Sequence, residues 1–114
     1  MSADLDVFVR SADVAWDTVG EGMRRQVLGH GTDLMIVRVE FEQDATGPLH
    51  HHPHRQATYI VAGLFEVTVG AETTELGVGD VFYAPTNVPH SVRAIQAGTL
   101  VDVFTPIRED FLRA

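Results

Sequence analysis

Cysteine and lysine are both absent from this sequence of 114 residues, and all eight of its basic residues are arginine. Without cysteine the chain can form no disulfide bond, and it offers no thiolate as a metal ligand or as a nucleophile. Any metal ion must therefore be bound through nitrogen and oxygen atoms. Without lysine, catalysis through a lysine Schiff base is excluded.

Positive charge is scarce as well, and the formal net charge is −8. Proteins that bind nucleic acid need a basic patch to neutralise phosphates, so this charge argues against nucleic acid as a partner. Its plainest consequence is solubility. Long apolar runs are also missing, since no stretch approaches the roughly 18 apolar residues of a membrane-spanning helix. We therefore expect no membrane partner.

The first six residues, MSADLD, carry acids where a secretory signal carries positive charge followed by an apolar run. This pattern predicts a cytoplasmic protein. The length matches one domain and is too short for two hydrophobic cores. We expect a single domain over residues 1–114, in which residues 1–6 fray.

Alternation of apolar and polar residues dominates the chain and predicts β-strands. In the clearest run, residues 33–41, Met35, Val37, Val39 and Phe41 fall on one face. Further strands are expected at residues 23–28, 73–76, 81–84, 91–95 and 99–104, with single helical turns at 12–17 and 108–113. Many short strands separated by turn residues favour an all-β sandwich or closed barrel.

A second alternating run places apolar residues of one parity on both sides of a glycine. These residues are Tyr59, Val61, Phe65, Val67 and Val69, and Gly63 lies between them. A glycine inside a strand pattern indicates a β-bulge or a tight turn. Two paired strands are expected in this region.

Histidines are concentrated in residues 50–54 and at position 90, and these two places hold five of the six. Alternate residues of an extended backbone share a face, so His50 and His52 can point toward one site. In a barrel His90 can reach the same interior from a distant strand. A solvated polar loop is the alternative reading, whereas an internal run interrupted by Pro53 is unlike a purification tag.

The spacing around these histidines resembles the two motifs of the cupin family. His50-x-His52, three residues, Gln56, six residues and Gly63 follow the first motif, and Gly79, Pro85 and His90 fall at the intervals of the second. The chain departs from the motifs at Asp44, Asn87, Ala94 and Gln56, which replace two glycines, an asparagine and a glutamate. Asn is the residue that tolerates a left-handed turn next best to glycine. The resemblance implies a double-stranded β-helix, or jelly-roll, barrel.

In such a barrel the resemblance implies one divalent transition metal ion with His50, His52, Gln56 and His90 as ligands. Nickel, zinc, manganese and iron(II) all suit nitrogen and oxygen ligands. Three neutral imidazoles and a neutral amide leave the charge of the ion uncompensated, so it should act as a Lewis acid. The alternative for Gln56 is an amide that does not touch the metal.

A finer resemblance extends over nearly the whole chain. The segment His50-His51-His52-Pro53-His54-Arg55-Gln56 is similar to the His-x-His-Pro-His-Glu-Gln segment of the KdgF-like cupins of pectin degradation, with Arg55 in place of the glutamate. Members of that family linearise 4,5-unsaturated monouronates from pectin or alginate into an open-chain deoxy-keto-uronate. The resemblance therefore implies a metal-dependent isomerase or lyase-type enzyme, a small acidic sugar as its partner, and a homodimer.

Ring opening with ketonisation needs a base for the anomeric hydroxyl, an acid for the enol carbon and a cation for the carboxylate. The resemblance implies that Gln56 acts in catalysis as a metal ligand. Asp102 is the candidate proton shuttle, and Arg108 is the candidate residue that binds the substrate carboxylate. Phe104 and Tyr59 are candidate substrate contacts. The alternatives are a solvent-facing acid for Asp102, a surface cap for Arg108 and core packing for both aromatics.

Other functions of the same barrel stay open, because a fold alone does not define a reaction. A polyketide cyclase or an epimerase would use the same metal with a different substrate. A three-histidine iron dioxygenase would consume oxygen, and a non-catalytic sugar-binding cupin would bind a uronate without turnover. His54 is a candidate substrate contact or a support for the metal ligands, and an exposed loop histidine is the alternative.

Overall fold

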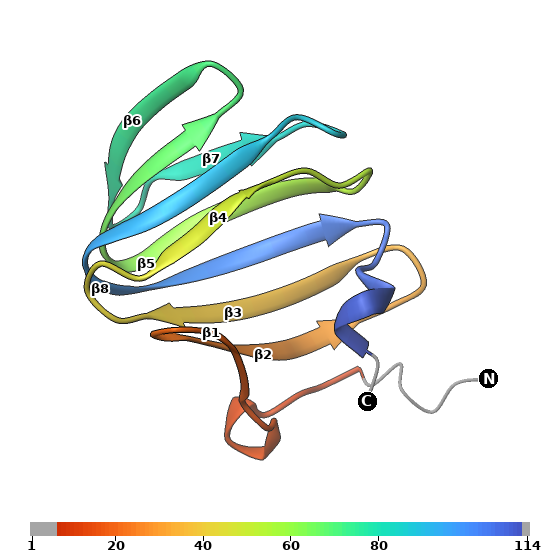
Figure 1. The fold of residues 1–114 in the computed structure, drawn as a ribbon. Coiled ribbons are helices and arrows are strands. Elements are labelled where there is room, and N and C mark those ends of the chain that lie inside the picture. The colour runs from red at the N-terminus through yellow and green to blue at the C-terminus, as the bar shows by residue number, and fades with distance from the viewer. Residues whose placement is uncertain (1–6, 113–114) are drawn as a thin grey trace.

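The computed structural model describes residues 7–112, which form an all-β barrel without any α-helix (Figure 1). The eight strands are β1 (Asp17–Gly20), β2 (Met23–His30), β3 (Met35–Phe41), β4 (Thr46–His50), β5 (Arg55–Val69), β6 (Glu72–Gly77), β7 (Val81–Ala84) and β8 (His90–Thr105). Two short 3-10 turns, η1 (Ser11–Asp13) and η2 (Glu109–Leu112), flank them. The expected fraying of residues 1–6 lies outside the described residues.

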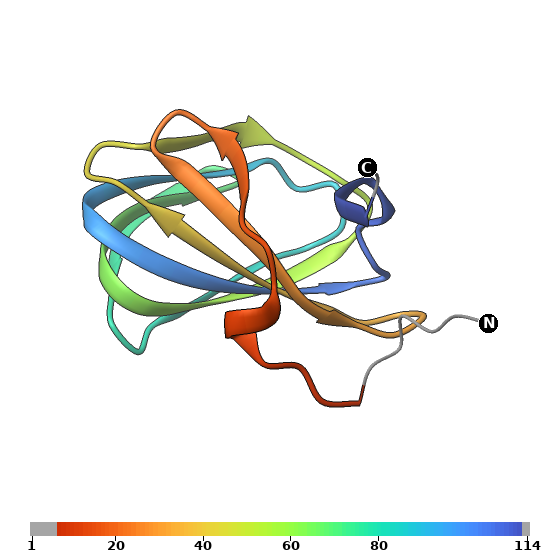
Figure 2. The same ribbon diagram turned by 90° about the horizontal axis from the view of Figure 1, so that it is seen from below.

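One antiparallel sheet contains all the strands in the order β1-β2-β3-β8-β5-β6, with β4 also paired to β8 and β7 also paired to β5. The two longest strands, β5 and β8, pair along most of their length and form the middle of the sheet. Seen from below, the strands curve around to face one another, and η2 lies near one end of this curve (Figure 2). The curvature brings the inward-facing side chains of distant strands together.

The hydrophobic core follows the alternation of β3. Met35, Val37, Val39 and Phe41 are all buried, as the sequence predicts, because every second residue of a strand points to the same side. Buried residues of β5, β7 and β8 complete the core. Phe41 packs edge-on against Phe65, with ring centroids 5.3 Å apart.

The prediction of two paired strands around Gly63 is wrong, because β5 is one continuous strand with a bulge. Gly63 has a φ of +91°, and a Cβ at this position would lie 2.7 Å from the backbone oxygen of Ala97. The pairing with β8 shifts register here, so residues of equal parity change faces. Tyr59 is therefore exposed, whereas Phe65 is buried.

Several expected boundaries also differ from the structure. Residues 91–95 and 99–104, expected as two strands, are parts of the single strand β8, while β1 and β4 have no expected counterpart. The turn expected at 12–17 is the shorter η1, after which β1 begins at Asp17. In the turn expected at 108–113, Glu109–Leu112 form η2, and residue 113 lies outside the described part of the chain.

Two residues that replace glycines of the cupin motifs adopt the left-handed conformation themselves. Asp44 has a φ of 67° and Asn87 a φ of 60°. Asp and Asn tolerate this region better than other non-glycine residues. The Asn87 N–H donates a hydrogen bond of 2.8 Å to the backbone oxygen of His52, so the second motif holds the backbone of the first.

Candidate metal centre

Three of the predicted histidines converge in the barrel. His50 ends β4, His90 begins β8 and pairs with His50, and His52 lies in the loop before β5. Their ring centroids are 4.3 to 5.5 Å apart. One nitrogen from each ring lies within 4.8 Å of the others, a spacing that allows one ion to bind all three.

The tautomer of each imidazole is fixed by its own backbone. Nδ1 of His50 donates to the carbonyl of Pro48 at 2.7 Å, and Nδ1 of His90 donates to that of Val88 at 2.9 Å. Nδ1 of His52 donates to the carbonyl of His54 at 2.9 Å. Because a carbonyl only accepts, each Nδ1 carries the proton and each Nε2 keeps a free lone pair. Such hydrogen bonds orient metal-binding histidines.

Gln56 completes this donor set through the orientation of its amide. Its Nε2 donates to Thr58 Oγ1 at 2.9 Å and to Asp102 Oδ1 at 3.1 Å, which fixes the opposite side of the amide as the oxygen. That oxygen, Oε1, lies 3.1 Å from His52 Nε2. Two lone pairs thus face each other, an arrangement that a bound cation resolves.

Burial favours the neutral form of His52 and His90. Desolvation lowers the pKa of His52, and the positive charge of Arg108 lowers it further. Desolvation also lowers the pKa of His90 to about 4. Among the described residues, no hydrogen-bond partner reaches the buried Nε2 of His90. Neutral rings with unused lone pairs are what a divalent metal requires, so the residues present fit the ion.

Asp102 stands beside this centre on β8. Its Oδ1 accepts hydrogen bonds from Thr58 Oγ1 at 2.5 Å and from Gln56 Nε2 at 3.1 Å. Its side chain is partly exposed to the cavity, but the barrel wall surrounds the carboxyl group. Burial raises the pKa of Asp102 to about 6, against the opposing effect of the two hydrogen bonds. A carboxyl group of this kind can exchange a proton near neutral pH.

A cavity of about 280 Å³ opens beside these residues. It is close to the lower end of the range for small-molecule sites, roughly 300 to 1,000 Å³. Its lining includes His50, Gln56, His90, Asp102, Phe104 and Arg108. Six of the predicted site residues are therefore brought together at one cavity, and His52 lies buried next to it.

The two aromatic candidates lie in different places. Phe104 is 2% exposed and packs edge-on against His52, with centroids 5.8 Å apart. Tyr59 is 48% exposed and lies on the outer face of β5, away from the inward-facing Gln56 and Thr58. The structure does not bring Tyr59 to the cavity, because the register shift at Gly63 reverses the face that the sequence parity indicated.

Arg108 is anchored at the cavity by its neighbours. Its Nε and Nη2 donate to the two carboxylate oxygens of Asp110 at 3.1 and 3.0 Å, and its guanidinium lies over Phe111, 4.2 Å from the ring centroid. His54 holds the same segment, since its Nε2 lies 3.1 Å from the backbone oxygen of Ile107. Arg55 is exposed at the start of β5.

Sequence reasoning missed two polar residues of the site. Thr58 is 1% exposed and shares the inward face of β5 with Gln56. Arg25 lines the cavity from β2, where it pairs with the inward-facing Val39. The signal for Arg25 was its parity, because it shares a face with the apolar Met23 and Val27 in the strand predicted at 23–28.

The structure is an all-β barrel in which three imidazole nitrogens and one amide oxygen converge on a candidate metal site. This combination is typical of the cupin class of β-barrels. The family model described as "Cupin domain" matches residues 37–104. The chain also aligns over 102 residues, at 38% identity, with "Pectin degradation protein KdgF" of Dickeya dadantii, covering 88% of this chain and 93% of that protein. The chain belongs to the cupin family and, within it, to the KdgF-like proteins.

Solved structures agree with this assignment. An RmlC-like cupin from Shewanella frigidimarina superposes with a TM-score of 0.90 at 37% identity, covering 93% of this chain and 96% of that one. The structure of KdgF from a Halomonas species superposes with a TM-score of 0.88 at 36% identity, covering 91% and 98%. A shorter match was found at the level of sequence. Oxalate decarboxylase OxdC of Bacillus subtilis is 30% identical over 71 residues, which cover 58% of this chain but 18% of that protein.

No helix in the described part of the chain is both long and apolar enough to cross a membrane.

Proposed function

We propose that this chain is a metal-dependent enzyme that opens the ring of 4,5-unsaturated monouronates from pectin or alginate to an open-chain deoxy-keto-uronate. The observation that carries the proposal is the placement of Asp102 beside three converging imidazoles at one cavity. The similarity to the Dickeya protein named for pectin degradation supports the substrate class. An acidic monosaccharide is also consistent with a small cavity that an arginine lines.

The residues that would hold the metal are His50, His52, His90 and Gln56. A divalent transition metal, whether nickel, zinc, manganese or iron(II), supplies a Lewis acid for substrate oxygens when bound there. The four ligands contribute no negative charge, so they leave the electrophilic character of the ion undiminished.

Asp102 is the residue that we assign to proton transfer. In this isomerisation the anomeric hydroxyl loses a proton while the bond between its carbon and the ring oxygen breaks. The enolate that results gains the proton at the former alkene carbon and becomes a ketone, so no other reactant is needed. Asp102 Oδ1 already accepts from Gln56 and Thr58, which leaves Oδ2 to take up and return the proton.

Arg108 and Phe104 are assigned to substrate binding. The guanidinium of Arg108 offers the substrate carboxylate the donors that Asp110 does not occupy. Phe104 presents an apolar wall at the cavity beside His52. An apolar wall and a few polar groups are typical of sites that orient a small ligand.

The test is turnover of an unsaturated galacturonate by the metal-loaded protein. Linearisation removes the ring alkene, so its ultraviolet absorbance should fall while a keto product accumulates. Uronate binding without loss of absorbance would contradict the enzyme assignment and favour a sugar-binding protein. Oxygen consumption with an iron-loaded sample would favour a dioxygenase, and turnover of other substrates alone would favour a cyclase or an epimerase.

We also propose that the chain forms a homodimer through the outer face of β5 and β7. Exposed apolar side chains gather on these paired strands, namely Ala57, Tyr59, Val61, Val81 and Tyr83. A contiguous group of exposed apolar side chains is a common mark of a protein interface. Sedimentation equilibrium should give a dimer, and Tyr59→Glu should shift the mass toward the monomer while uronate turnover persists.

A further inference from the structure

A second arginine, Arg25, lines the same cavity as the residues already discussed. It lies on β2, and its inward direction follows from its pairing with Val39, a residue of the core. The next residue back, Arg24, points the other way and forms a salt bridge of 2.7 Å with Glu40 on the outer surface. The side chains of these two adjacent arginines therefore lie on opposite faces of β2.

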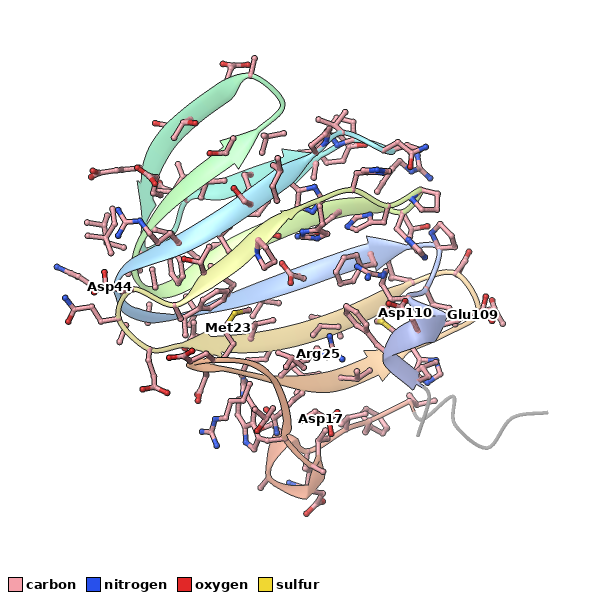
Figure 3. All side chains as sticks on the ribbon, in the orientation of Figure 1. Asp17, Met23, Arg25, Asp44, Glu109 and Asp110 are labelled. Carbon is pink, nitrogen blue, oxygen red and sulfur yellow. The ribbon has the colours of Figure 1, made fainter. Side chains whose placement is uncertain are left out.

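The side chain of Arg25 is partly buried, and its Nε atom is fully buried. Its Nε has no hydrogen-bond partner within the described residues, and no carboxylate among them lies within 4 Å of its nitrogens. Figure 3 shows Arg25 between Asp17 of β1 and Asp110 of η2. Asp110, however, is already paired with Arg108. A buried charged donor without an acceptor is costly, which suggests that a ligand supplies the acceptor.

Arg25 and Arg108 share one neighbour, Phe111. Their Cζ atoms lie 3.7 and 4.2 Å from the centroid of that ring. The two positive charges disfavour each other. The pKa of Arg25 is lowered first by burial and also by Arg108, while the charges of Asp17 and Asp110 oppose part of this shift. Since both residues line the same cavity, an anion bound there would relieve this repulsion.

The ion pair with Asp110 leaves only part of the Arg108 guanidinium available to a substrate carboxylate. Its Nε and Nη2, one of the edges that can form a bidentate pair, are occupied by Asp110. The Nε of Arg25 has no such commitment among the described residues. We propose that Arg25 binds the carboxylate of the acidic sugar together with Arg108, and so determines the preference for uronates over neutral sugars. This inference rests on the proposed function for the identity of the ligand.

The test compares two ligands that differ only in charge, glucuronate and its neutral amide glucuronamide, with the nickel-loaded full chain. Titration calorimetry should show tighter binding of glucuronate to the unchanged protein. In Arg25→Met the affinity for glucuronate should fall by about ten- to a hundredfold, the usual effect of losing a charged hydrogen bond. The affinity for glucuronamide should change by less than about threefold, because only the charge-dependent contact is lost.

Arg24→Met is the matched control, since it removes the neighbouring arginine from the opposite face of β2. It should leave both affinities unchanged. The metal content and the melting temperature of each variant are measured as well, because a fall in either would show that the variant has lost its fold. If Arg25→Met does not fold, Arg25→Lys serves instead, and it should lower glucuronate affinity by several-fold, because an ammonium keeps the charge without the planar fork.

Three results would overturn the inference: equal affinity of the unchanged protein for both ligands, unaltered glucuronate affinity in the Arg25 variants, or equal losses for both ligands in those variants. The last result would mean that Arg25 only packs against Phe111. Turnover separates this question from the reaction. If Arg25→Met still linearises the uronate with an unchanged KM, the proposed role of Arg25 is wrong but the proposed reaction stands. If glucuronate binding depends on Arg25 but no uronate is linearised, the proposed reaction is wrong but the role of Arg25 stands.

Discussion

Gln56 Nε2 lies 3.1 Å from Asp102 Oδ1 and donates a hydrogen bond to it, while Gln56 Oε1 faces His52 Nε2 at the same distance. One amide thus connects the candidate metal centre to the candidate proton shuttle. A carboxylate at position 56, as in the general cupin motif, could not donate to Asp102. The glutamine therefore keeps a second negative charge away from the metal and stabilises the ionised form of Asp102.

Gln56→Glu should retain the metal but slow uronate linearisation by at least about tenfold. The new carboxylate would neutralise part of the charge of the ion and repel Asp102, and two adjacent carboxyl groups would share a proton. Steady-state kinetics with metal analysis measures both effects. Gln43→Glu, an exposed change of the same kind, is the control. An unaltered rate would mean that Gln56 does not act at the metal.

Metal content should depend on the histidines that converge. We expect about one divalent transition metal ion per chain in protein purified without chelators. His52→Ala and His90→Ala should each lower the occupancy sharply, because each removes one of the Nε2 lone pairs. Elemental analysis measures the metal, and His51→Ala, an exposed neighbour, should change nothing. Full occupancy in both ligand variants would contradict the assignment of the centre.

Asp102→Asn should leave the fold and the metal in place but slow linearisation by about two to four orders of magnitude, the usual contribution of a positioned acid or base. The amide has nearly the same shape but cannot take up the proton. Asp33→Asn, on the exposed surface, is the matched control. Near-normal turnover with Asn at position 102 would assign Asp102 to structure.

Asp110→Asn tests how Arg108 is held. The hydrogen bonds from Arg108 lower the pKa of Asp110, so the ionised carboxylate stabilises the folded state above its ordinary pKa of 3.8. That stabilisation is lost as the pH falls through the lower folded pKa. Urea unfolding at pH 7 should show a loss of about 0.5 to 1 kcal/mol for this partly exposed pair, and the difference from the unchanged protein should shrink in acid. A constant difference at all pH values would contradict the role of the charge.

The bulge at Gly63 should be essential for the barrel, and Gly79 offers a comparison with the same backbone angle. Both glycines have a φ of +91°, but a Cβ at Gly79 meets nothing within 4 Å, whereas one at Gly63 meets the backbone of Ala97 and Gly98. Gly79→Ala should cost about 1 to 2 kcal/mol through backbone strain. Gly63→Ala should cost at least about 2 kcal/mol more, because strands β5 and β8 must separate. Equal costs in denaturant unfolding would show that the close approach is unimportant.

The sequence predicted much of the centre because its signals are local. Alternation along one strand identified the buried face of β3, and the spacing of His50, His52 and His90 matched motifs whose geometry is shared by a family. Asp44 and Asn87, which replace glycines of the motifs, could be interpreted from the sequence because their effect is also local. A left-handed backbone angle is a property of a single residue and its own sterics.

The sequence alone determined the all-β class, the nitrogen and oxygen character of any metal site, and the three histidines that converge at the candidate centre. Only the tertiary structure decided which way Tyr59 points, how the amide of Gln56 is turned, and that Arg25 reaches the cavity. Each of these depends on contacts between strands far apart in the chain. A bulge such as that at Gly63 reverses the faces of a strand, and an inward arginine is indistinguishable from an outward one until the barrel closes around it.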